Sequence, residues 1–152
     1  MESKSQPTIL KRVRARLYLW SGRIHRHYGI VHADRNEFVS AIEDYGKAVK
    51  MNPSLDIAYL ERGTILWREL GRATHAIRDL TFALNSRPNW PDALFNRALA
   101  YQAAGNYEAA MDDFSSYLEQ GDDRWRHDAA SQLQQIRALF DGKNTSQGNE
   151  LS

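Results

Sequence analysis

The chain has 152 residues, 42% of them hydrophobic and 26% charged, which is enough for one compact domain or a short repeat array. It contains no cysteine, and this excludes disulfides, thiolate zinc sites and cysteine nucleophiles. The formal net charge is +1, but the first 28 residues hold seven Lys/Arg against one Glu, so the rest of the chain carries −5. A basic segment on an acidic body can attract an anionic partner or an acidic patch of another copy.

No run of apolar residues is long enough to span a membrane. The apolar stretch near the N-terminus is short and interrupted by arginine, unlike a signal peptide. The expected location is therefore cytoplasmic.

The first seven residues are polar and are expected to be flexible. Apolar side chains then recur at steps of three or four residues, which is the spacing of one helix face. These side chains are Ile9, Val13, Leu17, Trp20, Ile24, Tyr28 and Val31. The pattern predicts one helix over residues 8–33 that packs through the start of this stripe, with a break near Gly22 as the alternative.

The N-terminal helix is the first member of three helix pairs, and the other five helices of these pairs follow it along the chain. One further helix comes after the third pair. Turn and stop signals place the pairs at about residues 22–56, 57–90 and 91–124, within a single domain over 8–140. The sequence PDALFNRALAYQAAGNYEAAMDDFSSYLEQGDDR is the clearest pair. A last amphipathic helix is predicted at about 123–140, and residues 141–152 are expected to be disordered.

The three pairs repeat at an interval of 34 or 35 residues. The second helix of each pair has an alanine and, four positions later, a larger apolar residue. Three positions after that comes an alanine or a tyrosine. The aligned residues are Ala41, Ala76 and Ala110, then Tyr45, Leu80 and Phe114, then Ala48, Ala83 and Tyr117. Small residues let two helices approach closely and large ones fill the groove between pairs, so we predict that the pairs stack.

This pattern resembles the tetratricopeptide repeat family. The family's spacing is met at Leu94, Ala98, Tyr101, Ala110 and Phe114, at Leu60, Thr64, Trp67, Ala76, Leu80 and Pro88, and more divergently at Tyr28, Gly29, His32, Ala41, Tyr45 and Pro53. The resemblance covers about residues 22–124. It implies an all-α fold: a right-handed superhelical array of three helix pairs with an extended N-terminal helix and a C-terminal capping helix.

In this family the first helix of each pair lines the concave face, where ligands lie. The resemblance therefore implies a non-catalytic scaffold that binds a peptide or partner helix there. The candidate binding residues are Arg26, Ile30, Arg62, Ile65, Arg68, Phe95, Asn96, Leu99 and Gln102. The apolar ones among them are expected to be displayed on the groove. The alternative is that they contact the N-terminal helix, the capping helix or a second copy, as in a self-assembling structural unit.

Some family members hold the terminal carboxylate of chaperone clients with lysine and asparagine. Arg26 and Asn96 occupy two of the matching positions. Ile30 and Arg62 stand where asparagines would be expected, and Asp92 would repel a carboxylate. These departures argue against such a clamp.

The basic arm (Lys11, Arg12, Arg14 and Arg16) has three interpretations. It is most simply the solvated face of a helix packed by Ile9, Val13 and Leu17. It can also dock an acidic partner or the acidic body of another copy. Binding to nucleic acid or a membrane is the least favoured, because stacking aromatic residues do not interleave with the arginines.

No arrangement typical of a catalytic or metal site is present. The paired carboxylates Asp112-Asp113 and Asp122-Asp123 fit a solvated helix face or a helix cap better than acid–base chemistry. The sequence contains no phosphate loop and no dinucleotide-binding motif. We therefore expect a protein without enzymatic activity, metal or cofactor, whose partner is another protein or peptide, with a homo-oligomer also possible.

Overall fold

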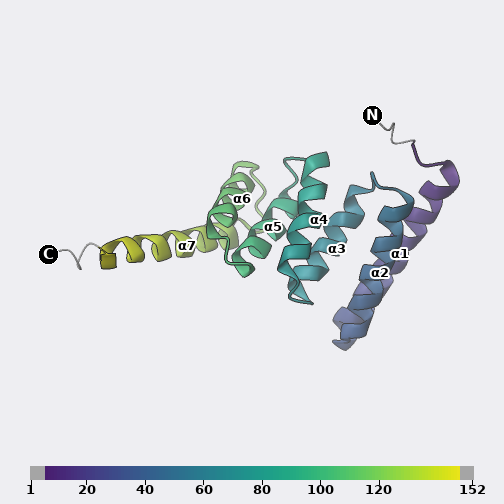
Figure 1. The fold of residues 1–152 in the computed structure, drawn as a ribbon, viewed down its shortest axis with the longest axis horizontal. Coiled ribbons are helices and arrows are strands. Elements are labelled where there is room, and N and C mark those ends of the chain that lie inside the picture. The colour runs from purple at the N-terminus through teal and green to yellow at the C-terminus, as the bar shows by residue number, and fades with distance from the viewer. Residues whose placement is uncertain (1–5, 148–152) are drawn as a thin grey trace.

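The computed structural model describes residues 6–147, and their backbone forms helices joined by short turns (Figure 1). The helices are α1 (Ile9–His32), α2 (Arg35–Met51), α3 (Asp56–Arg68), α4 (Ala73–Ser86), α5 (Pro91–Ala103), α6 (Tyr107–Glu119) and α7 (Arg126–Gln147). The expectations for residues 1–5 and 148–152 lie outside the described part of the chain.

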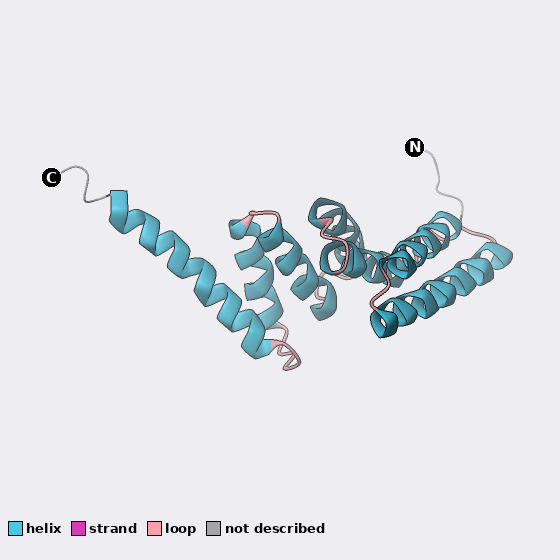
Figure 2. Cartoon of the chain, turned by 90° about the horizontal axis from the view of Figure 1, so that it is seen from below, coloured by secondary structure: helices cyan, strands magenta, loops and turns pink. Residues whose placement is uncertain are grey.

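The helices form three pairs, α1/α2, α3/α4 and α5/α6, which stack one after another with α7 at the far end. Seen from below, the array is elongated, with α1 and α2 at one end and α7 at the other (Figure 2). This is the right-handed superhelical, all-α architecture expected from the sequence.

The repeated small and large residues of the second helices form the core. Ala41, Ala76 and Ala110 are completely buried, as are the larger side chains four positions later, Tyr45, Leu80 and Phe114. Ala48, Ala83 and Tyr117 are buried equally completely. The predicted core positions of the repeat are therefore confirmed.

The turns follow from local chemistry. Gly71 and Gly105 adopt positive φ values of 65° and 77°, a conformation that favours glycine at helix ends. Asp34 and Asn106 accept hydrogen bonds from backbone N–H groups in the first turns of α2 and α6. Pro91 begins α5, where its missing N–H group costs nothing.

The helix α1 is continuous through Gly22. A Cβ atom at this position would lie only 2.6 Å from the Cε1 atom of Tyr45, whose ring is fully buried. The glycine therefore marks the closest approach of α1 to α2 and does not break the helix.

The expectation that α1 packs through its large apolar stripe is wrong. Leu17 is 61% exposed and Trp20 is 65% exposed, and Ile9 and Val13 are exposed as well. The face of α1 that contacts α2 consists of Ala15, Leu19, Gly22 and Gly29 instead. Small residues form this contact because the rings of Tyr45 and Phe38 pack directly against the α1 backbone.

The helix α7 continues to Gln147, beyond the predicted end at residue 140. The backbone of residues 141–147 is therefore helical, where the sequence predicted disorder. The stripe of α7 faces the array as predicted, with Ala129, Leu133 and Ile136 buried. In the part of the chain that the structure describes, no helix is both long enough and apolar enough to cross a membrane.

Candidate functional site

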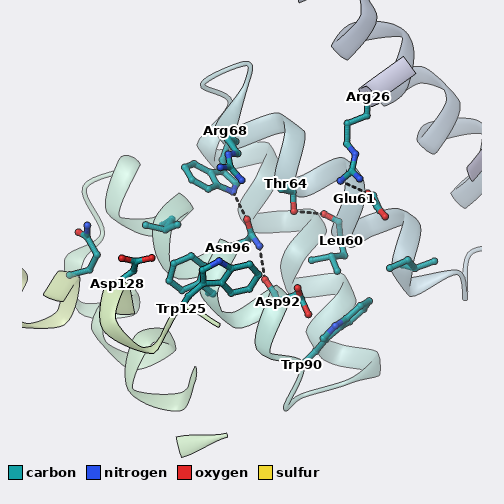
Figure 3. Close-up of a pocket in the computed structure, with 15 residues that line it drawn as sticks. Arg26, Leu60, Glu61, Thr64, Arg68, Trp90, Asp92, Asn96, Trp125 and Asp128 are labelled. Carbon is teal, nitrogen blue, oxygen red and sulfur yellow. Dashed lines mark hydrogen bonds and ion pairs between the residues drawn. The ribbon is translucent and has the colours of Figure 1, made fainter. Parts of the chain in front are cut away.

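A groove with a volume of about 650 Å³ runs along the concave side of the array (Figure 3). Its lining comes from α1, α3, α5 and the N-terminal part of α7, together with Trp90 and Trp125 in the turns just before α5 and α7. Trp67, Trp90 and Trp125 line it, and each is only half-buried. Three of the four tryptophans of the chain therefore present part of their surface to this groove.

Arg26 forms an ion pair within the protein, with a carboxylate that it shares with Arg23. Its Nη1 atom lies 2.9 Å from Oε2 of Glu61, and Nη2 of Arg23 lies 3.0 Å from the other carboxylate oxygen. Glu61 thus joins α1 to α3 through two guanidinium groups. Burial, together with the negative charge of Glu61, raises the pKa of the nearby Tyr45 hydroxyl above its usual value.

Arg62 points away from the groove and into its own helix pair. Its Nε and Nη2 atoms donate to the two carboxylate oxygens of Asp79 at 2.7 and 2.8 Å. Burial alone would lower the pKa of Arg62, but the hydrogen bonds and the charge of Asp79 outweigh it and raise the pKa. Arg97 makes the same two-pronged contact with Asp113 in the next pair.

Asn96 lies in the groove wall, but its side chain already has partners. Its Oδ1 atom accepts from the indole N–H of Trp67 at 3.1 Å, and its Nδ2 atom donates to the backbone carbonyl of Asp92 at 2.7 Å. The residue is 8% exposed. Asn96 therefore links α3 to α5 and orients the Trp67 ring.

The C-terminal end of the array contacts two of the predicted binding residues, one through the turn residue Trp125 and one through α7. The ring of Phe95 stacks on Trp125, with 4.8 Å between centroids and an interplanar angle of 13°. The side chain of Gln102 donates to Oε1 of Gln132 at 2.8 Å. The predicted alternative, contact with the capping helix, describes Gln102, whereas Phe95 contacts the turn residue Trp125 just before α7 and also lines the groove.

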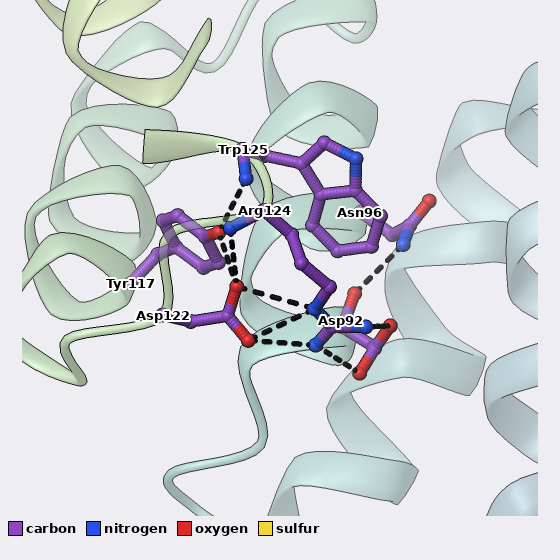
Figure 4. A network of polar contacts seen from close by, with 6 residues as sticks. All are labelled: Asp92, Asn96, Tyr117, Asp122, Arg124 and Trp125. Atoms are coloured by element: carbon purple, nitrogen blue, oxygen red, sulfur yellow. Dashed lines mark hydrogen bonds and ion pairs between the residues drawn. The ribbon is translucent and has the colours of Figure 1, made fainter. Parts of the chain in front are cut away.

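A polar network fixes the turn between α6 and α7 against α5 (Figure 4). Arg124 donates to both carboxylate oxygens of Asp92, at 3.0 and 2.9 Å, and also to Asp122. The Tyr117 hydroxyl donates to Asp122 at 3.0 Å and accepts from the backbone N–H of Trp125 at 2.9 Å. Hydrogen bonds from Arg124 lower the pKa of Asp122 to about 2, against an opposing effect of burial.

The remaining predicted residues lie in different places. Leu99 and Arg68 line the groove, and Arg68 is exposed. Ile65 is only 2% exposed and packs in the core between the first two pairs, so the expectation that it is displayed on the groove is wrong. Ile30 is 61% exposed but lies outside the groove lining.

The basic arm lies on the N-terminal half of α1, away from the groove. Lys11, Arg12, Arg14 and Arg16 are all exposed. Among the side chains that the structure describes, none of them takes part in an ion pair. The packing expected through Ile9, Val13 and Leu17 is absent, as described above.

Sequence reasoning missed a buried carboxylate that recurs in every pair. Asp44, Asp79 and Asp113 are 7%, 3% and 5% exposed, so Asp113 does not belong to a solvated face. Each immediately precedes the large core residue of its second helix, and this shared repeat position was the available signal. Asp44 lacks an arginine partner and instead accepts from Ser21 and Lys47. These hydrogen bonds outweigh burial and lower its pKa.

Nothing in the described part of the chain gathers three or more histidine or carboxylate side chains in a metal-binding arrangement. His25 contacts Glu37 at 2.6 Å and lies 3.8 Å from Asp44, which ties α1 to α2. The polar groups of the site therefore serve mainly to join helices.

Comparisons with known proteins agree with this architecture. Residues 91–120 match the family model described as "Tetratricopeptide repeat". No curated protein sequence matches the chain. The matched segment is the third helix pair, and the two preceding pairs share its repeat interval and core positions.

Solved structures show the same fold at low sequence identity. The first TPR of Spaghetti (RPAP3), bound to the HSP90 peptide SRMEEVD, is 20% identical, covers 85% of this chain and 94% of its own, and superposes with a TM-score of 0.74. The Arabidopsis OM64 TPR domain is 19% identical, with coverages of 85% and 98% and a TM-score of 0.73. The TPR2B domain of yeast Sti1, in a pHsp70 complex, is 19% identical, with coverages of 86% and 98% and a TM-score of 0.68.

Proposed function

We propose that this protein is a non-catalytic interaction module that holds an extended peptide or a partner helix in its concave groove. The observation that carries this proposal is the exposure of Trp67, Trp90 and Trp125 along one cavity of about 650 Å³. Tryptophan is enriched among the residues that dominate binding energies, because it buries a large rigid surface. The module would act as a scaffold or adaptor, and its cytoplasmic location stays a prediction.

The groove favours an apolar or aromatic anchor over a strongly acidic peptide. Two of the solved relatives are in complexes with HSP90 or Hsp70 ligands, and the HSP90 peptide ends in EEVD. In this chain, however, Arg26 is paired with Glu61 and Arg62 with Asp79. Asp128 adds a negative charge to the lining, which disfavours a carboxylate-rich ligand.

The floor of the groove requires little rearrangement before binding. Asn96 is held between Trp67 and the Asp92 carbonyl, and Phe95 is held by Trp125. Contacts that are already formed reduce the ordering cost of association. We assign the direct contacts to Trp67, Trp90, Trp125, Leu99 and Arg68, with Asn96, Phe95 and Gln102 positioning them.

Selection from a displayed random-peptide library tests this proposal. Peptides enriched on the wild-type protein should contain aromatic or large aliphatic residues and should lose at least about tenfold in affinity with Trp90→Ala. The matched control is Phe82→Ala, which removes an exposed aromatic ring on α4, outside the groove lining, and should leave affinity unchanged. Binding can be measured by fluorescence polarisation of labelled peptides.

The peptide SRMEEVD serves as the acidic comparison in the same assay and should bind more weakly than the selected peptides. Selected peptides whose affinity survives both Trp90→Ala and Leu99→Glu would refute the assignment of the groove. Tighter binding of SRMEEVD than of any selected peptide would refute the preference for an apolar anchor.

A further inference from the structure

The helix α1 has two apolar faces, and only one of them is used within the described chain. Its inner face, formed by small residues and Leu19, contacts α2. Its outer face carries seven large apolar side chains, all exposed except the half-buried Ile24. They are Ile9, Val13, Leu17, Trp20, Ile24, Tyr28 and Val31. Trp20 is the most exposed tryptophan of the chain, with 65% of its surface accessible.

The outer face lies at the end of the array. In Figures 1 and 2, α1 is the outermost helix and no other described segment lies beyond it. Its 24 residues correspond to about 36 Å of helix, and the apolar side chains follow one side over this length. The face is the ridge of a single helix, so it can touch a flat surface along its whole length. Arg26, which lines the groove, lies on the side of α1 that faces α3. A surface that contacts the outer face of α1 therefore leaves the groove open.

The charges that flank this ridge are all of one sign. The helix contains six Lys/Arg residues and no Asp or Glu. At about 100° per residue, Arg14 falls on one side of the apolar face, while Arg12 and Arg16 fall on the other. All three are exposed, and in the described part of the chain none has an acidic partner.

This combination decides between the possible occupants. A partner helix normally lays its apolar face into a groove, whereas α1 offers a ridge. In a second copy docked face to face, two helices would have to approach one another, each with no anion and with four Lys/Arg residues that have no ion pair in the described chain. An anionic lipid surface accepts a ridge of aromatic and aliphatic side chains and attracts the arginines on both of its sides.

We propose that α1 is a membrane-surface helix that lies in the plane of an anionic bilayer. Leu17, Trp20 and their neighbours enter the boundary between headgroups and acyl chains, and Arg12, Arg14 and Arg16 contact the negatively charged headgroups. The sequence-based preference for a solvated arm depended on internal packing of Ile9, Val13 and Leu17, and their exposure removes that reason. This surface is separate from the groove and does not depend on the function proposed for it.

Vesicle flotation with the full chain tests the proposal. Vesicles of phosphatidylcholine with about 30% phosphatidylserine should bind the wild-type protein at least about tenfold more strongly than pure phosphatidylcholine, and added salt should weaken this binding. Leu17→Glu and the double change Arg14→Glu with Arg16→Glu should each abolish it. The matched control Phe82→Glu places the same charge on an exposed aromatic position of α4 and should bind like the wild type.

Tryptophan emission gives a second, independent measurement. Binding to the anionic vesicles should shift the emission to shorter wavelength, and Trp20→Phe should keep the binding while removing most of the shift. The proposal is overturned if the wild type ignores anionic vesicles, or if Leu17→Glu binds as strongly as the wild type. It is equally overturned if sedimentation shows a wild-type dimer that Leu17→Glu converts to a monomer, because the ridge would then be a self-contact.

Discussion

The two ends of the array carry similar apolar stripes but use them in opposite ways. At the C-terminal end, Ala129, Leu133 and Ile136 of α7 are buried and cover the third helix pair. At the N-terminal end, the stripe through Leu17 and Trp20 faces outward, and small residues of α1 make the contact with α2. An apolar stripe at helical spacing therefore indicates a contact surface, but it does not tell which surface lies inside.

The difference between the ends should appear most strongly in stability. Ile136→Ala removes a fully buried side chain from α7, at the C-terminal end of the array, and is expected to cost roughly 2–5 kcal/mol of unfolding free energy. Leu17→Ala removes a similar side chain that is 61% exposed and should change the unfolding free energy by less than about 0.5 kcal/mol. Urea denaturation of both variants measures the contrast, and equal losses would show that the Leu17 face is buried in solution.

A second variant tests the close contact between the inner face of α1 and α2. Gly22→Ala places a Cβ atom 2.6 Å from the buried Tyr45 ring, so strain should cost roughly 1–3 kcal/mol despite the better helix propensity of alanine. Gly46→Ala is the matched control, because its Cβ would meet only the Arg62 Nη1 atom at 3.5 Å. The control should gain up to about 1 kcal/mol from helix propensity. A stabilised Gly22→Ala protein would contradict the close contact of α1 with α2.

The smallest change in stability is expected for the polar network of Asp122, in the turn between α6 and α7. The pKa of Asp122 is about 2 in the folded protein, below its ordinary value of 3.8. A lowered pKa means that this carboxylate stabilises the fold above pH 3.8 and loses that contribution as the pH falls towards 2. The stability difference between the wild type and Asp122→Asn should therefore shrink across this range. Thermal unfolding at several pH values measures it, and a constant difference would contradict the role of the Asp122 charge.

Much of the fold could be predicted because residues at equivalent positions of the three repeats are buried in the same way. Ala41, Ala76 and Ala110 occupy one repeat position and Tyr45, Leu80 and Phe114 another, and all six are fully buried. The face of α1 could not be predicted in the same way. Periodicity shows that Leu17 and Trp20 share one side of a helix, but not that Gly22 and Ala15 on the other side admit the rings of α2.

The candidate site was only partly predictable for a related reason. Leu99, Arg68 and Asn96, which were chosen by repeat position, line the groove. Repeat position could not show that the Asn96 side chain is hydrogen-bonded to Trp67, or that Arg26 is paired with Glu61, because these partners lie in neighbouring repeats. Contacts between repeats depend on the stacking geometry, which a single-repeat pattern does not contain.

Side-chain bridges connect the helices along the groove, and they have a mechanical consequence. Glu61 joins α3 to α1, the Trp67–Asn96 bond joins α3 to α5, and the Gln102–Gln132 bond joins α5 to α7. Each joint of the superhelix thus has its own restraint against opening. We expect each joint to open separately, so that the groove can widen between two neighbouring helices while the next joint keeps its curvature.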